Sequence, residues 1–193
     1  TPTTTVTIAP ATINAAGSLV NLQANNDITI TNAIAMTTSS IGITMRAGRD
    51  ILINANVSTN NGAITMTAND NGATGANRDA GTGDIVFGAV SLNSGTAATS
   101  LTIGSSSVAP FSPGSILIGG TASITGDGGI TLTGTVNSVT TNNALTLNST
   151  GTTTITGAVG GTLALSSLTT NAGGTTNING GSIITTGSQT YGD

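Results

Sequence analysis

Carboxylates and guanidinium groups are the only side chains in this sequence that carry charge near neutral pH. There are seven acidic and three basic residues, every acid is Asp and every base is Arg, and His, Cys, Lys and Glu are absent. Nucleophilic units with an imidazole base, zinc sites and phosphate-binding loops all need residues that are missing. Glycosidase-like chemistry with Asp alone remains. Because each repeat supplies a single Asp with no His or Lys, we predict a protein that is not an enzyme.

Three of the aspartates recur at one place in the sequence pattern, directly before an Ile: Asp27, Asp50 and Asp84. One interpretation is a carboxylate ladder that binds Ca²⁺, which takes six to eight oxygen ligands. The other is structural: each side chain accepts backbone N–H groups in an Asx-type turn. We favour the structural interpretation, with Arg46 and Arg49 offsetting the local charge.

A polar segment between two of these repeats holds further oxygen ligands. Its candidates for a Ca²⁺ site are Asp70, Asp79 and Asp84, with Asn71 and Asn77 between them. Their spacing does not fit an EF-hand loop. We therefore expect a solvated loop and no cofactor, and bound Ca²⁺ is the alternative.

The charge balance limits the partners. The formal net charge is −4 at pH 7, whereas duplex nucleic acids and anionic membranes attract basic patches. No run of about 18 apolar residues is present, so no membrane span is predicted. The sequence predicts neither nucleic acid nor membrane as a partner.

Short runs of alternating apolar and polar residues, bounded by Gly, Asn, Asp or Ser, fill the chain. Alternation with period two predicts half-buried strands, and the abundant Thr, Ile and Val favour them. The run at residues 20–34 recurs at 43–57, and a third copy opens at 64–68. Near the C-terminus Leu145 and Leu168 show the same offset as the first two copies.

A period of about 20–25 residues built from short strands and turns predicts a solenoid, in which stacked coils share a narrow core. We expect one all-β, right-handed parallel β-helix over residues 1–193. Two segments interrupt the period, and we predict that both are extruded loops. They are residues 69–83 (NDNGATGANRDAGTG) and 105–114 (SSSVAPFSPG).

The coil pattern resembles the filamentous-haemagglutinin type of bacterial exoprotein, an adhesin of two-partner secretion. Residues 22–34 (LQANNDITITNAI), 45–57 (MRAGRDILINANV) and 62–68 (GAITMTA) carry this resemblance. Residues 185–193 (TTGSQTYGD) look like the opening of a further repeat, which predicts that the chain belongs to a longer protein. The resemblance implies a right-handed β-helix, secretion to the bacterial surface, and an adhesive or scaffolding role in contact with host, matrix or neighbouring cells.

Three functions follow from these observations. The first is a non-enzymatic adhesin or structural rod that contacts a host or matrix glycan or protein, as in a biofilm matrix. The second is a subunit of an extracellular filament that stacks on itself head to tail, since neither end shows a helix or a charged residue that would block an open sheet edge.

The third function is ice binding by outward Thr-x-Thr ranks. The pairs are Thr29/Thr31, Thr65/Thr67, Thr131/Thr133 and Thr154/Thr156. We rank ice binding last, because Leu52, Asn54 and Val86 interrupt the ranks and because Thr also favours ordinary strand surfaces.

Overall fold

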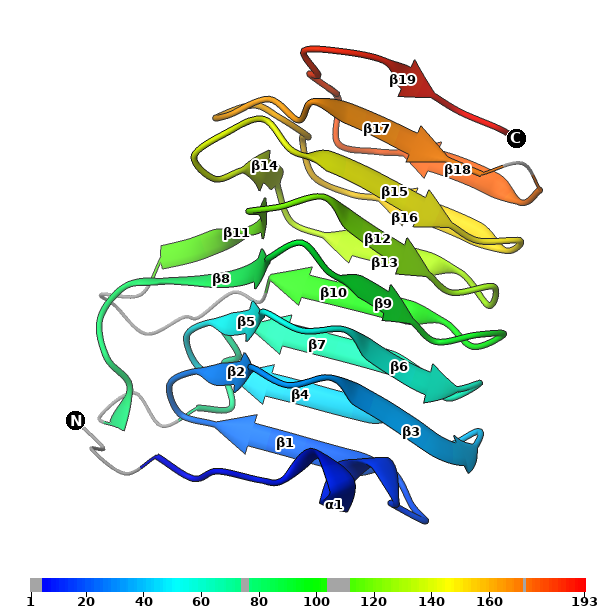
Figure 1. The fold of residues 1–193 in the computed structure, drawn as a ribbon. Coiled ribbons are helices and arrows are strands. Elements are labelled where there is room, and N and C mark those ends of the chain that lie inside the picture. The colour runs from blue at the N-terminus through cyan, green and yellow to red at the C-terminus, as the bar shows by residue number, and fades with distance from the viewer. Residues whose placement is uncertain (1–4, 74–76, 104–111, 172) are drawn as a thin grey trace.

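The computed structural model describes residues 5–73, 77–103, 112–171 and 173–193. In Figure 1 the chain winds into successive coils, and equivalent strands of successive coils lie one above another. Every strand pairing between these coils is parallel and joins strands from successive coils. The predicted parallel β-helix is therefore confirmed.

Three sheets form the sides of the coil. Sheet A consists, in spatial order, of β1 (Val20–Ala24), β4 (Ile43–Ala47), β7 (Ile64–Ala68), β10 (Thr99–Ile103), β13 (Ile130–Thr133), β16 (Thr152–Ile155) and β18 (Thr175–Ile178). Sheet B consists of β14 (Val136–Ser138), β11 (Ser112–Ile118), β8 (Thr82–Phe87), β5 (Ile51–Ile53) and β2 (Ile28–Ile30). Sheet C consists of β19 (Gln189–Thr190), β17 (Ser167–Thr170), β15 (Ala144–Asn148), β12 (Ala122–Thr125), β9 (Ser91–Asn93), β6 (Val57–Asn60) and β3 (Ile34–Ser39).

The core is narrow because period-two alternation sends one side chain of each pair inward. In β7 the burial alternates, with Ile64 and Met66 fully buried and Thr65 and Thr67 partly exposed. The inward residues of neighbouring coils stack, as Met45 does on Met66. Ile, Leu, Val, Met and Ala fill nearly all of this core, and Phe87 is its largest buried side chain. Aliphatic side chains without aromatic rings suit a core that is only one coil wide.

The register shows where the period is lost. In the first coils Val20 pairs with Ile43, and the hydrogen bond between Asp50 and Asp27 spans 23 residues. Further along, Ile64 pairs with Thr99, which is 35 residues later in the chain. The hydrogen bond between Thr96 and Asn61, which joins the same two coils, also spans 35 residues. Extra chain between β7 and β8 accounts for much of this longer coil.

The predicted loops differ in their bounds from the observed elements. The segment 69–83 ends inside β8, which begins at Thr82, and its residues Asn69, Asp70 and Arg78 are buried. In the second segment, residues 105–111 lie outside the described residues, and residues 112–114 belong to β11. Both corrections arise because strand pairing with the neighbouring coil resumes before the polar composition ends.

A short helix, α1 (Pro10–Asn14), covers the first coil, which corrects the expectation that neither end shows a helix. Pro10 opens the helix, where its missing N–H costs nothing. Ile13 is buried against the core, and the Asn14 side-chain oxygen accepts the N–H of Ala35 in β3 (2.8 Å). A five-residue helix is too short to show a helical period in the sequence, so the pattern gave no sign of it.

In the described ranges, no helix has the length and apolar character needed to cross a membrane.

Candidate functional site

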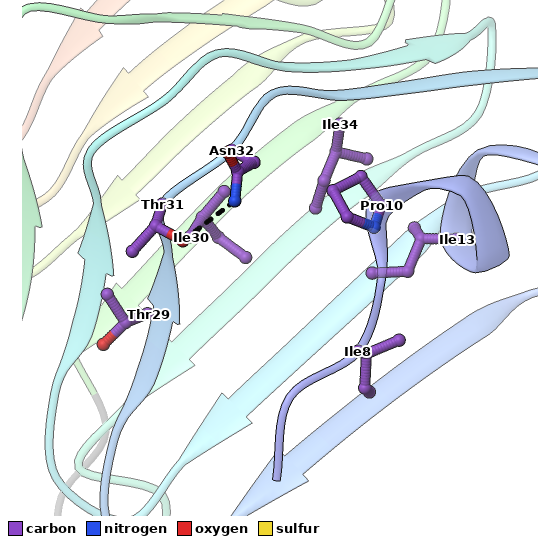
Figure 2. A pocket seen from close by; sticks show the side chains of 8 residues that line it. All are labelled: Ile8, Pro10, Ile13, Thr29, Ile30, Thr31, Asn32 and Ile34. Carbon is purple, nitrogen blue, oxygen red and sulfur yellow. Dashed lines mark hydrogen bonds between the residues drawn. The ribbon is translucent and has the colours of Figure 1, made fainter. Parts of the chain in front are cut away.

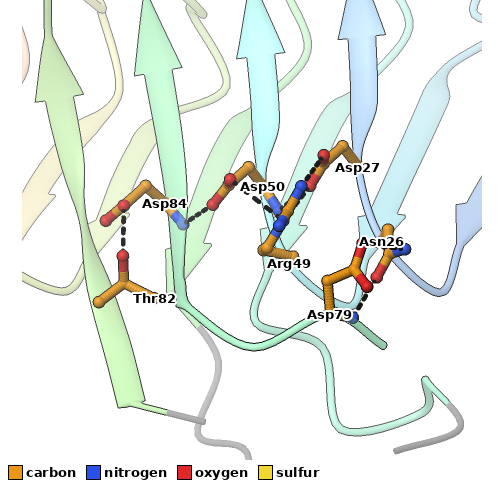
Figure 3. Close-up of polar contacts among 7 residues, drawn as sticks. All are labelled: Asn26, Asp27, Arg49, Asp50, Asp79, Thr82 and Asp84. Carbon is orange, nitrogen blue, oxygen red and sulfur yellow. Dashed lines mark hydrogen bonds and ion pairs between the residues drawn. The ribbon is translucent and has the colours of Figure 1, made fainter. Parts of the chain in front are cut away.

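The corner that leads into sheet B places the three recurrent aspartates in a column. Each precedes the first inward Ile of its strand, and these Ile residues pair across β2, β5 and β8. The register therefore stacks Asp27, Asp50 and Asp84 on successive coils. Figure 3 shows the three side chains along one edge of the sheet.

Each carboxylate in this column binds the backbone of the next coil. The N–H of Asp50 donates to Oδ1 of Asp27 (3.1 Å), and the N–H of Asp84 donates to Oδ1 of Asp50 (2.9 Å). The N–H of Ser115 donates to Oδ1 of Asp84 (2.6 Å). The aspartates thus serve the structural role favoured from the sequence, but the bonded N–H lies one coil further on and not within an Asx turn.

Arg49 lies between two of these carboxylates. Its Nε donates to Oδ1 of Asp27 (2.8 Å), its Nη2 reaches Oδ2 of the same residue (2.5 Å), and Nε lies 3.5 Å from Oδ2 of Asp50. This fork geometry suits a planar guanidinium and a carboxylate. The hydrogen bond from Arg49 to Asp27, with the charges of nearby aspartates, raises the pKa of Arg49 and keeps it a permanent cation.

The two carboxylates beside Arg49 have pKa values shifted in opposite directions. Burial raises the pKa of Asp27, but the hydrogen bonds from Arg49 and from the Asp50 N–H, with the charge of Arg49, outweigh it and lower the pKa overall. Burial also raises the pKa of Asp50, and the charges of Asp27 and Asp84 add to this rise. Asp50 is therefore a less favourably placed negative charge than Asp27.

The chain that follows β7 folds back onto the earlier coils. Asp70 is buried and pairs with Arg46 of β4 (2.9 Å). Asp79 accepts a hydrogen bond from the Asn26 amide (3.0 Å), and its own N–H donates to the Asn26 oxygen (2.6 Å). These contacts reach back 24 and 53 residues along the chain. The described residues 70–73 and 77–79, which we call the strap, are thus bonded to the first coils through Asp70 and Asp79.

The candidate calcium ligands have separate partners. Asp70 pairs with Arg46, Asp79 pairs with Asn26, and Asp84 binds the Thr82 hydroxyl (2.9 Å) as well as the Ser115 N–H. Among the described residues, no group of three or more acidic, His or Cys side chains is placed to hold a metal ion. Asn71 and Asn77 of the same segment are exposed.

Two hollows lie near this end of the molecule. A notch of about 50 Å³ lies beneath the N-terminal segment and α1 (Figure 2). Its lining is mostly apolar: Ile8, Pro10, Ile13, Thr29, Ile30, Thr31, Asn32 and Ile34. A polar depression of about 260 Å³ lies beside the strap, lined by Gln23, Ala24, Asn25, Arg46, Asp70, Gly72 and Ala73. The notch has no charged group, and the Arg46–Asp70 ion pair occupies the charged side of the depression.

Asn side chains that the sequence analysis did not single out also join successive coils. The Oδ1 atoms of Asn56 and Asn61 accept the N–H groups of Ser91 and Thr96 (2.9 and 3.0 Å). These two residues flank β6 on either side. Their place next to a strand end was the signal available in the sequence, but the many other Asn residues obscured it.

The outward Thr residues do not all lie on one face. Thr29 lies in β2 of sheet B, in register with Leu52 of β5 and Val86 of β8. The two apolar residues that seemed to break the Thr ranks therefore belong to sheet B. Sheet A carries the other three Thr pairs and, between them, Ser100 and Thr102 of β10.

Comparisons of the chain with protein-family models, with curated proteins and with solved structures found no match. The resemblance to filamentous-haemagglutinin-type exoproteins stays a prediction from the residues that carry it.

Proposed function

We propose that this chain is a non-enzymatic β-helical rod of a secreted bacterial surface protein, and that its outer faces make adhesive contacts with a host or matrix glycan or protein. One observation carries the proposal. Most of the charged side chains among the described residues are engaged in contacts between coils, as the column of Asp27, Asp50 and Asp84 shows.

A rod of this kind resists deformation because its ladders are continuous. Backbone hydrogen bonds link successive coils along the whole of sheets A and C and along sheet B as far as β14, and side-chain bonds from Asp and Asn reinforce the corners. An opening at one coil must break several of these bonds together. Such a segment suits a protein that holds a binding surface away from a cell and withstands proteases there.

The outer faces favour contact with other molecules over catalysis. On sheet C the outward residues Ser123 and Thr146 pair across β12 and β15, and both are partly exposed. Hydroxyl and amide groups of this kind make many weak hydrogen bonds with a partner. The affinity of such contacts rises when many copies act together.

The test uses beads coated with the purified chain and three probes: a monolayer of cultured epithelial cells, immobilised extracellular-matrix proteins, and an array of mixed glycans. We expect the coated beads to be retained on at least one probe under flow. The matched control carries Leu132→Asp, which places a charge in a fully buried position of the core and disrupts the coil.

Circular dichroism confirms that the first chain is folded and that the control is not. Retention that depends on the folded chain supports the proposal. Equal retention of beads with the folded chain, beads with the control and bare beads, on all three probes, contradicts it.

A further inference from the structure

The outer face of sheet A carries two unbroken ranks of hydroxyl groups. The strands β7, β10, β13 and β16 each present one residue to the first rank, and the register places these residues side by side. The first three of these strands also present one residue each to the second rank, which Thr156, directly after β16, continues. We call this set the hydroxyl face: Thr65, Thr67, Ser100, Thr102, Thr131, Thr133, Thr154 and Thr156. All eight are partly or fully exposed.

Among the residues that the structure describes, most hydroxyl groups of this face have no hydrogen-bond partner. Thr156 accepts the N–H of Gly134 (3.4 Å) and donates to the carbonyl of Leu132 (3.2 Å). In the described part of the chain, the other seven hydroxyls make no hydrogen bond to a protein group. They are therefore available to water or to a ligand.

The geometry gives the face a regular two-dimensional repeat. Neighbouring strands lie about 4.8 Å apart, and residues two apart on one strand are separated by roughly 6.7 Å. On β7, β10 and β13, the outward residue next to the first rank is small. These residues are Ala63, Ala98 and Gly129, which directly precede the paired residues Ile64, Thr99 and Ile130. Small residues therefore border this side of the ranks on these three strands, whereas Arg46 of β4 lies beside Thr67 at one end of the second rank.

We propose that the hydroxyl face orders water into an ice-like lattice and binds the surface of ice. Ice is flat, uncharged and periodic on the same scale of a few ångströms, and it both donates and accepts hydrogen bonds. Thr suits such a surface because its hydroxyl bonds to the lattice while its methyl group, with χ1 restricted, limits disorder in the water beside it. This proposal goes beyond the adhesive rod and does not depend on it.

The composition of the face argues against other partners. Protein interfaces draw most of their energy from Trp, Tyr and Arg, and the eight residues include none of these. Small molecules bind in concave sites with converging polar groups, whereas this face is the outer side of a sheet. It has no charge to steer an ionic partner, and its nearest charged residue, Arg46 of β4, pairs with Asp70.

The test measures thermal hysteresis and crystal shape when the purified chain is cooled with a single ice crystal. The disrupting variant is Thr131→Lys, which places a long charged side chain in the middle of one rank. Its matched control is Thr146→Lys, the same change at an outward position on β15 of sheet C that is also partly exposed. A third variant, Ser100→Thr, supplies the one methyl group that the ranks lack.

We expect the unmodified chain and Thr146→Lys to give equal hysteresis and to facet the crystal, Thr131→Lys to lose both effects, and Ser100→Thr to increase the hysteresis. Circular dichroism checks that all four proteins are folded. Absence of hysteresis and shaping with the unmodified chain overturns the proposal, as does equal activity of the two Lys variants. Neither result bears on adhesion in the bead assay.

Discussion

At the scale of single residues, the two carboxylates beside Arg49 make opposite contributions to stability. Asp27 receives two hydrogen bonds from Arg49 and one from the backbone of the next coil. Asp50 receives a backbone hydrogen bond but lies between Asp27 and Asp84 in the column. The same change at the two positions should therefore have different effects.

We expect Asp50→Asn to raise the melting temperature at pH 7 slightly, with a gain of at most about 1 kcal/mol. The amide keeps an oxygen for the N–H of Asp84 and removes a charge whose pKa is raised in the folded state. Between the ordinary aspartate pKa, about 3.9, and this raised value, the folded state binds more protons than the unfolded state. Stability due to Asp50 therefore falls as pH rises through this window, and the difference between variant and parent should shrink in acid.

The matched control for this measurement is Asp27→Asn. The pKa of Asp27 is lowered, so its contribution is present above the ordinary aspartate pKa and is lost as pH falls through the lower folded value. Losing the ionic contact with Arg49 should cost about 1–2 kcal/mol at pH 7. Melting curves that move in the same direction for both variants would contradict the assignment of the two carboxylates.

The candidate calcium ligands lead to a prediction about added metal. Asp70, Asp79 and Asp84 are each bonded to a different partner, so a cation would have to break those contacts before binding. We expect the melting temperature in excess EDTA to equal that in millimolar Ca²⁺. A saturable increase with Ca²⁺ that Asp79→Asn abolishes would instead support a site in the strap.

At the scale of elements, a column of stacked glycines lets neighbouring coils approach one another closely. Gly134, Gly157 and Gly180 recur at a constant interval of one coil, at the turns that follow sheet A strands. A Cβ on Gly157 would collide with the carbonyl oxygen of Gly134 and lie 2.7 Å from the backbone nitrogen of Thr135. The colliding atoms are backbone, so the neighbouring coil would have to move.

We expect Gly157→Ala to destabilise the protein by about 1–3 kcal/mol, the usual cost of overpacking. Gly161→Ala is the control, because a Cβ there meets nothing within 4 Å. Its effect should stay within about 0.5 kcal/mol. The two free energies of unfolding come from urea titration, and equal values would mean that the coils do not pack as closely at Gly157 as described.

At the scale of the whole molecule, charge and end structure are unevenly distributed. Eight of the ten charged residues lie between Asp27 and Asp84, and the exceptions are Asp127 and Asp193. In the first coils, Arg46 forms an ion pair with Asp70 and Arg49 forms one with Asp27. In the later coils, uncharged Thr, Ser and Asn take the outward positions, because like charges stacked one coil apart would repel.

The end that α1 covers bears on head-to-tail assembly. An unpaired strand edge recruits another strand, and α1 blocks the edge of β3 through Asn14. We expect Ile13→Asp to loosen α1, to lower the melting temperature and to increase concentration-dependent association in analytical ultracentrifugation. Thr12→Asp, an exposed position on the same helix, is the control. If both variants sediment like the parent at all concentrations, α1 does not protect this end from pairing.

Much of the architecture was already determined by local patterns in the sequence. Alternation with period two decides which side chains face inward, and a repeat of constant length requires stacked coils of equal size. The Asp column could be predicted for the same reason, because Asp27, Asp50 and Asp84 hold one place relative to an inward Ile. These features depend on near neighbours or on a regular repeat, and both can be read along the chain.

Only the tertiary structure decided which residues share a face. A coil has three sides, and a Thr-x-Thr run does not itself encode the side it occupies, so Leu52 and Val86 of sheet B seemed to break ranks that lie on sheet A. Ser100 joins the hydroxyl face across the enlarged coil, whose length the repeat does not predict. The bond between Asn26 and Asp79 spans 53 residues. Such contacts depend on where the inserted chain lies between paired strands. Pairing with the adjacent coil determines that place, and the spacing along the sequence does not.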